Sequence, residues 1–199
     1  MSPTDSHAAL SEQRVVLVDT ADQLFHENGI TATTMQDVRK KASVSAHDLA
    51  ALFDTKDQLV EAVLEDRHDA WMDQIQSCYS HVDDPRDKIL TIFNYLERSF
   101  ATGSHLEPTF EEGYGELRPG DTWVAAMRTR HVLGFSALVE DLAEQAELPR
   151  MIGSSIALLA EGAQTTAAAT HSVAPARDGR AAAAMLIALH QTDPDAEVF

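Results

Sequence analysis

The chain has 199 residues, and its 32 acidic side chains against 15 basic ones give a formal net charge of −17 at pH 7. That length suffices for one domain or two small ones, each with an apolar core. A chain this acidic lacks general affinity for nucleic acids and for anionic membranes, so any contact with DNA must be local.

Cys78 is the only cysteine, so the chain cannot form an intrachain disulfide. This agrees with a reducing compartment, and we expect a cytoplasmic protein. No lysine or arginine lies near Cys78 in the sequence, so an inert place in the fold is favoured over a redox sensor. The polar residues 1–10 predict neither a signal peptide nor a membrane span.

An amphipathic helix is predicted at the start of the chain. Leu17, Ala21 and Phe25 recur at helical spacing and give the segment one apolar face. Ser11 is a suitable N-cap, and the pattern stops at Asn28. The sequence therefore predicts a helix from about Ser11 to Asn28.

Two short helices joined by a tight turn are predicted between Thr33 and Phe53. The first covers about residues 34–41, and the second begins at Ser45, which is a favourable N-cap. Helices of two turns are marginal in water, so both must pack against the first helix of the chain. This spacing is that of a helix-turn-helix, whose second helix enters the major groove of DNA.

A long motif runs from Ala21 to Leu64. Its members are Leu24, Phe25, Gly29, Thr33, Thr34, Asp37, Val38, Ala42, Val44, Ser45, Leu49, Phe53, Lys56, Leu59, Val63 and Leu64. With these residues the chain resembles the TetR family of bacterial one-component regulators. The resemblance implies a helix-turn-helix DNA-binding domain of three helices in residues 1–54, and a helical ligand-binding and dimerisation bundle in residues 55–199. It also implies a homodimeric repressor that a small, partly apolar effector releases from operator DNA.

The turn and the second helix of the motif depart from the family's usual AGVSxGTLYxHF. The departures are Ser43 and His47 for glycines, Asp48 for threonine, Ala50 for tyrosine and Leu52 for histidine or an aromatic residue. A carboxylate repels phosphates, although it can accept a hydrogen bond from cytosine. Residues 1–60 also hold nine acids and only five bases. A ligand-binding or protein-interaction module with degenerate or lost DNA readout is therefore the alternative.

The candidate DNA contacts are the basic residues of the motif and the residues at its helix starts. They are Thr33, Thr34, Arg39, Lys40, Lys41, Ser45, Ala46, His47 and Lys56. The cations would neutralise phosphates, and the hydroxyls would donate to phosphates at a helix N-terminus.

The rest of the chain also predicts helices and no strand. They are expected at about 56–79, 85–100, 122–147, 150–171 and 180–190. Glycines and prolines leave only a short irregular helix near 109–112, and Pro175 with Gly179 indicates a loop before a last helix capped by Asp178. The prediction is an all-α fold of about nine helices.

Two further sites are expected in the C-terminal part. The ligand-pocket candidates are Phe93, Leu96, Phe100, Phe110, Tyr114, Trp123, Met127, His131 and Gln164, although such residues are more often plain core. A dimer interface is expected on the last two helices, through Ile156, Leu159, Ala160, Met185, Leu186 and Leu189, although this stripe could pack only within one monomer.

Catalysis and metal binding are not expected. The sequence has no G-x-S-x-G elbow, P-loop or His-Glu-x-x-His motif. Glu65 and His68 form one Glu-x-x-His pair, but di-iron bundles need a second copy, which is absent. We therefore predict no enzyme, no cofactor and no metal, with operator DNA, a small effector and a second copy of the chain as partners.

Overall fold

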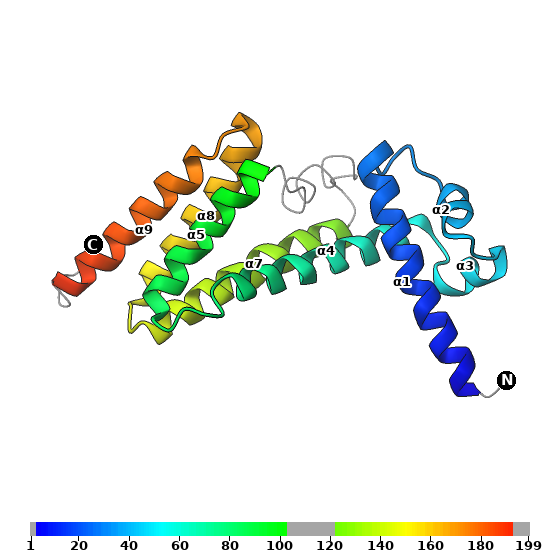
Figure 1. Ribbon diagram of the computed structural model, residues 1–199, viewed down its shortest axis with the longest axis horizontal. Coiled ribbons are helices and arrows are strands. Elements are labelled where there is room, and N and C mark those ends of the chain that lie inside the picture. Colours follow the sequence, from blue (N-terminus) through cyan, green and yellow to red (C-terminus); the bar gives the residue numbers. More distant parts are fainter. Residues whose placement is uncertain (1–2, 103–121, 193–199) are drawn as a thin grey trace. The chain divides into compact units, whose positions relative to one another are not determined.

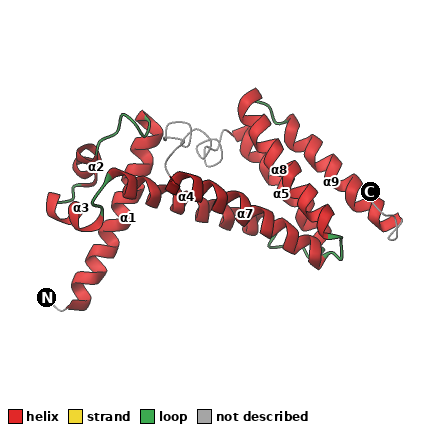
Figure 2. Ribbon diagram, turned by 180° about the vertical axis from the view of Figure 1, so that it is seen from behind, coloured by secondary structure: helices red, strands yellow, loops and turns green. Residues whose placement is uncertain are grey.

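The computed structural model describes residues 3–102 and 122–192. Within these ranges the chain forms α-helices and no strand, which confirms the all-α prediction (Figure 2). The eight described helices are α1 (Pro3–Asn28), α2 (Met35–Ala42), α3 (Ala46–Leu52), α4 (Lys56–Cys78), α5 (Pro85–Thr102), α7 (Thr122–Gln145), α8 (Arg150–Thr170) and α9 (Ala174–Thr192), labelled in Figure 1. The short helix expected near 109–112 lies outside the described residues.

The chain divides into two compact units, each with its own apolar core. Described residues within Met1–Asp69 and Thr109–Met127 form the first unit, which we call the headpiece. Those within Ala70–Pro108 and Arg128–Phe199 form the second unit, which we call the body. The division falls inside α4 and inside α7. In the described ranges, every helix is too short or too polar to cross a lipid bilayer.

The headpiece core is built on the apolar faces of α1 and α4. Buried side chains from these two helices surround Val38 of α2 and Leu49 of α3. The buried side chains are Leu17, Val18, Ala21, Leu24 and Phe25 from α1, and Leu59, Val60, Ala62, Val63 and Leu64 from α4. Because α2 and α3 each bury one residue, this core rather than their own length stabilises them.

The helix α1 begins at Pro3, earlier than the expected start at Ser11. Proline is well suited to the first position of a helix, where no backbone N–H is needed. No glycine or second proline separates Pro3 from Ser11, so the helix continues through the serine, which is therefore not an N-cap.

The predicted helix-turn-helix is confirmed, with capping bonds at both ends of α2 and at the start of α3. Thr34 opens α2 by a capping box with Asp37, and its hydrogen bonds lower the pKa of the Asp37 carboxyl. At the other end, Ser43 adopts a left-handed conformation with φ of 57°. The Val44 N–H donates to the Arg39 carbonyl at 3.2 Å in a Schellman arrangement. The Ser45 hydroxyl then caps α3 by accepting from the Asp48 N–H at 3.0 Å.

In the body, α5, α8 and α9 pack side by side (Figure 1). The helix α9 begins at Ala174, six residues before the expected start at Arg180. The prediction of a loop over Pro175 and Gly179 was wrong for two physical reasons. Proline is tolerated in the first turn of a helix. Gly179 gives room for α5, since a Cβ atom there would lie 2.8 Å from Cε1 of Phe93.

Cys78 is half-buried at the end of α4, and burial raises the pKa of its thiol to about 11, although Arg98 partly opposes this. The thiol therefore stays protonated at neutral pH. We expect iodoacetamide to alkylate Cys78 at pH 8 roughly 100-fold more slowly in the folded protein than in urea, where the pKa returns to about 8.5. Mass spectrometry at timed intervals measures both rates. Equal rates would contradict the burial that we assign to this side chain.

Candidate nucleic-acid interface

The helix α3 presents a small, nearly uncharged face. Its sequence AHDLAAL holds two polar residues, His47 and Asp48. Leu49 faces the core, whereas His47, Ala50 and Ala51 are exposed. The expected contacts Ser45 and Ala46 are also exposed, but the Ser45 hydroxyl already accepts a backbone bond as the N-cap.

Two consecutive residues of α1 contact α3 and its C-cap. The Gln13 side-chain amide donates from Nε2 to Oδ2 of Asp48 at 3.4 Å. The guanidinium carbon of Arg14 lies 5.6 Å from the centre of the Phe53 ring, at the C-cap of α3. A cation over an aromatic face is attracted to the ring quadrupole. The orientation of α3 therefore depends on α1 as well as on the apolar core.

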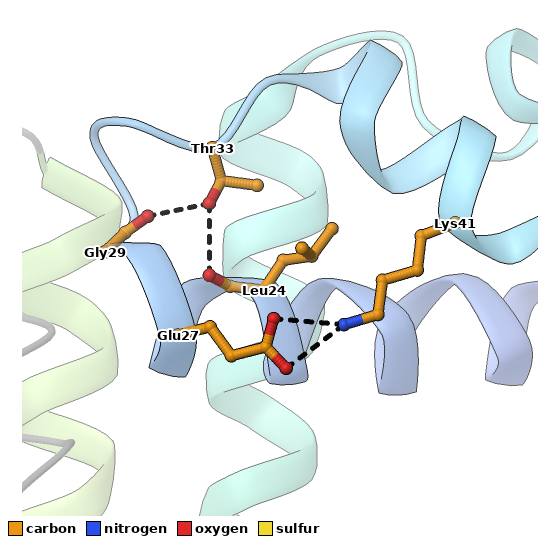
Figure 3. A network of polar contacts seen from close by, with 5 residues as sticks. All are labelled: Leu24, Glu27, Gly29, Thr33 and Lys41. Carbon is orange, nitrogen blue, oxygen red and sulfur yellow. Dashed lines mark hydrogen bonds and ion pairs between the residues drawn. The ribbon is translucent and has the colours of Figure 1, made fainter.

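The three cations expected at the end of α2 lie together in its last turn, where they also complement the helix dipole. Lys40 is exposed. Arg39 is half-buried, and its Nη1 donates to the Val44 carbonyl at 3.4 Å, which ties it to the turn. Lys41 forms an ion pair with Glu27 of α1 at 3.2 Å (Figure 3). Lys40 is thus the cation of this group that is best placed to meet a phosphate.

Two other expected contacts are engaged inside the headpiece. Thr33 is only 3% exposed, and its hydroxyl donates to the carbonyls of Gly29 and Leu24 at 2.8 and 3.2 Å (Figure 3). Lys56 donates from Nζ to the carbonyls of Ile30 and Thr31. Both side chains hold the connection between α1 and α2. Thr34 is exposed and remains at the surface.

The ligand-pocket candidates do not share one core. Phe93 and Leu96 are buried in the body, and Phe100 packs partly buried beside them. Met127 and Trp123 belong to the headpiece core instead. Phe110 and Tyr114 lie outside the described residues.

Two polar candidates lie in the body. The His131 ring lies 4.7 Å from that of Trp71, which itself contacts Phe135. The side-chain nitrogen of Gln164 is buried and has no hydrogen-bond partner among the described residues.

The dimer candidates separate into two groups. Ile156 and Ala160 are buried within the body, where they pack in its apolar core. Met185 and Leu189 are 66% and 50% exposed, and with Leu159 and Leu186 they line an apolar groove between α8 and α9. Leu158, which was not among the predicted contacts, lines the same groove and is 73% exposed. Apolar residues occur all around α8, so helical periodicity did not indicate which of them would be exposed on its outer face.

The headpiece also carries a polar hollow beside the end of α3. It has a volume of about 330 Å³ and is lined by Arg14, Ala51, Leu52, Phe53, Asp54, Gln58, Glu61, Ala62 and Glu65. Among residues 3–102 and 122–192, no group of three or more histidine, cysteine or carboxylate side chains could hold a metal ion.

The helix-turn-helix segment matches a known family model. Residues 17–63 match the model of the tetR family of bacterial regulatory proteins. One curated relative is the HTH-type transcriptional repressor KstR2 of Rhodococcus jostii RHA1. It is 36% identical over 62 residues, which are 31% of this chain and 30% of the relative. The chain spans less than half the length of the curated relatives that it matches.

Solved structures share the fold over most of the chain. The reduced form of E. coli NemR has a TM-score of 0.71 and 19% identity over 86% of this chain and 95% of that one. The SmeT–triclosan complex has a TM-score of 0.65 and 17% identity over 89% of this chain and 91% of that one. The helix-turn-helix of this chain is therefore similar to that of the tetR family of bacterial regulatory proteins, and its helical fold is shared with these solved structures.

Proposed function

We propose that this protein is a cytoplasmic, DNA-binding transcriptional repressor that acts as a homodimer and leaves its operator when a small, partly apolar effector binds. Residues 1–54 would bind DNA, and residues 55–199 would bind the effector and the second copy. The observation that carries the proposal is the capped helix-turn-helix of α2 and α3, within the segment that matches the family model. The matched relatives named as repressors support the same activity.

The apolar groove between α8 and α9 supports the homodimer. Leu158, Met185 and Leu189 expose large apolar side chains next to one another on two packed helices. Contiguous apolar surface on a folded chain is typical of an interface. A second copy would bring a second helix-turn-helix, which a palindromic operator requires.

A partly apolar effector is supported by the chemistry of the body. Phe93, Leu96 and Phe100 offer apolar surface, while His131 and the buried amide of Gln164 offer polar groups. The neighbour SmeT, which shares the fold, was solved in complex with triclosan. Effector binding would release DNA by favouring a conformation with lower operator affinity.

Operator binding is tested with the DNA that flanks the protein's own gene. We expect saturable, salt-sensitive binding in fluorescence anisotropy titrations at physiological salt with competitor DNA. Lys40→Ala is expected to weaken binding roughly three- to tenfold and to lower the salt slope by about 1, because a phosphate contact is lost. Lys88→Ala, on α5 in the body, is the matched control and should leave both quantities unchanged.

Absence of specific binding by a protein confirmed as a dimer would contradict the repressor. It would favour the second candidate function, a ligand-binding or protein-interaction module without DNA readout. The observations behind this candidate are the acidic headpiece and the internal engagement of Thr33, Lys41 and Lys56. Small molecules can be screened for release of the complex once an operator is known.

A further inference from the structure

We propose that His47 is the base-reading residue of α3, and that Gln13 holds the Asp48 carboxylate away from the DNA. The proposal rests on the proposed function, because it takes α3 as the helix that enters the major groove. It goes further by naming which side chain selects the operator, and how a helix that carries a carboxylate can approach a polyanion.

The position of His47 follows from the packing of α3. Leu49 is the residue of α3 that is buried in the headpiece core. At 3.6 residues per turn, His47 and Ala51 lie roughly 160° from Leu49 around the helix axis, so they share the face directed away from the core. Both are exposed, and so is Ala50 beside them. The outward face of α3 therefore combines one imidazole with alanine methyl groups.

The position of Asp48 follows from α1. Asp48 and Ala50 lie on opposite flanks of α3, each about 100° from Leu49. The Asp48 flank faces α1, where the Gln13 amide donates to its carboxylate at 3.4 Å. Asp48 is half-buried there, whereas its neighbour His47 is exposed. The hydrogen bond thus restrains the negative charge on the side of α3 that meets the protein.

The chemistry of this face selects the bases. An imidazole N–H can donate to N7 or O6 of guanine, which present two adjacent acceptors in the major groove. Alanine methyl groups make apolar contacts with the methyl group of thymine. The expected half-site therefore contains a guanine, read by His47, next to one or more thymines, which contact Ala50 and Ala51.

Base selection is tested by enriching random duplexes on the purified full chain. The wild type is expected to enrich a half-site with guanine beside thymine. His47→Ala is expected to lose the preference at the guanine by about tenfold and to retain the preference at the thymines. An unchanged base preference in His47→Ala would overturn the inference while leaving the repressor intact. If the wild type enriches no sequence at all, the proposed function itself fails.

The role of Gln13 is tested by a double-mutant cycle on the enriched operator. Gln13→Ala is expected to weaken binding roughly three- to tenfold, because the freed carboxylate can turn toward phosphates. The same change in an Asp48→Ala background should have no effect, since no carboxylate remains to be restrained. An equal loss in both backgrounds would show that Gln13 acts on DNA or on folding directly, and would overturn this part. Thermal unfolding of all four proteins verifies that the headpiece is folded.

Discussion

Leu158→Glu is expected to convert the proposed dimer of this chain into a monomer. Leu158 is 73% exposed and lines the apolar groove between α8 and α9. Placing a carboxylate without a partner in an interface costs several kcal/mol in desolvation. A twofold interface contains each residue twice, so the dissociation constant should rise by more than about 100-fold. Sedimentation equilibrium over a range of protein concentrations measures this change.

The matched control is Leu133→Glu on α7. Leu133 also belongs to the body and is 60% exposed, but it does not line the groove. This change should leave the dissociation constant as in the wild type. If both variants stay dimeric, the groove is not the interface, and another surface must pair the two copies. If neither the variants nor the wild type dimerises, the homodimer itself is refuted.

Gly153→Ala is expected to lower the free energy of unfolding by about 1–2 kcal/mol, although alanine favours helices. An added Cβ atom would lie 2.9 Å from the Cβ atom of Ala143 and 3.3 Å from the Cα atom of Glu140. Both contacts come from α7, and one is with backbone, so relief requires a shift of the whole helix. Urea denaturation followed by circular dichroism measures the change.

Gly162→Ala on the same helix is the control, and it is expected to change the free energy of unfolding in the opposite direction. A Cβ atom at Gly162 would meet nothing within 4 Å. This change should raise the free energy of unfolding by about 0.5–1 kcal/mol, because glycine loses more backbone entropy on folding. Destabilisation of similar size in both variants would show that the close approach of α7 to Gly153 does not cause the effect of Gly153→Ala. Both proteins are compared with the wild type at several protein concentrations, since α8 contributes to the proposed dimer.

The helix-turn-helix could be predicted because its signals are local. Thr34 and Ser45 are N-caps that bond to residues three positions later, and such spacing is visible in the sequence. The same is true of Asp84 and Pro85 at the start of α5, where the Asp84 carboxylate accepts from the Arg86 N–H at 2.8 Å. The starts of α2, α3 and α5 depend on neighbouring residues, and the sequence therefore predicted them.

The early start of α9 could not be predicted, because its cause is not local. A glycine such as Gly179 usually predicts a turn. Here it lies within a helix because Phe93, a residue far away in the sequence, packs against it. The same limit applies to Thr33 and Lys56, which look like phosphate contacts but bond to carbonyls around the α1–α2 connection. A donor at the right spacing does not reveal whether its partner is the protein or a ligand.

The pocket candidates could not be predicted reliably, because their sequence pattern is also that of core residues. Aromatic residues and methionines were selected for their position on apolar helical faces, and that criterion also selects plain core. Trp123 and Met127 share α7 with His131, yet they pack into the headpiece core, while His131 belongs to the body. Helical periodicity identifies the buried side of a helix, but it does not identify which core that side enters.

Ser43 joins α2 to α3 in a left-handed conformation without being a glycine. A side chain in this region raises the backbone energy by about 1 kcal/mol, and the Schellman bonds to the carbonyls of Arg39 and Lys40 hold it there. Opening of this turn alone would release that energy. Amide protons of the turn should therefore exchange with solvent through local fluctuations, whereas those of the buried part of α1 exchange through cooperative unfolding. Such exchange would identify the turn before α3 as a place where the angle between α2 and α3 can change without unfolding of the headpiece.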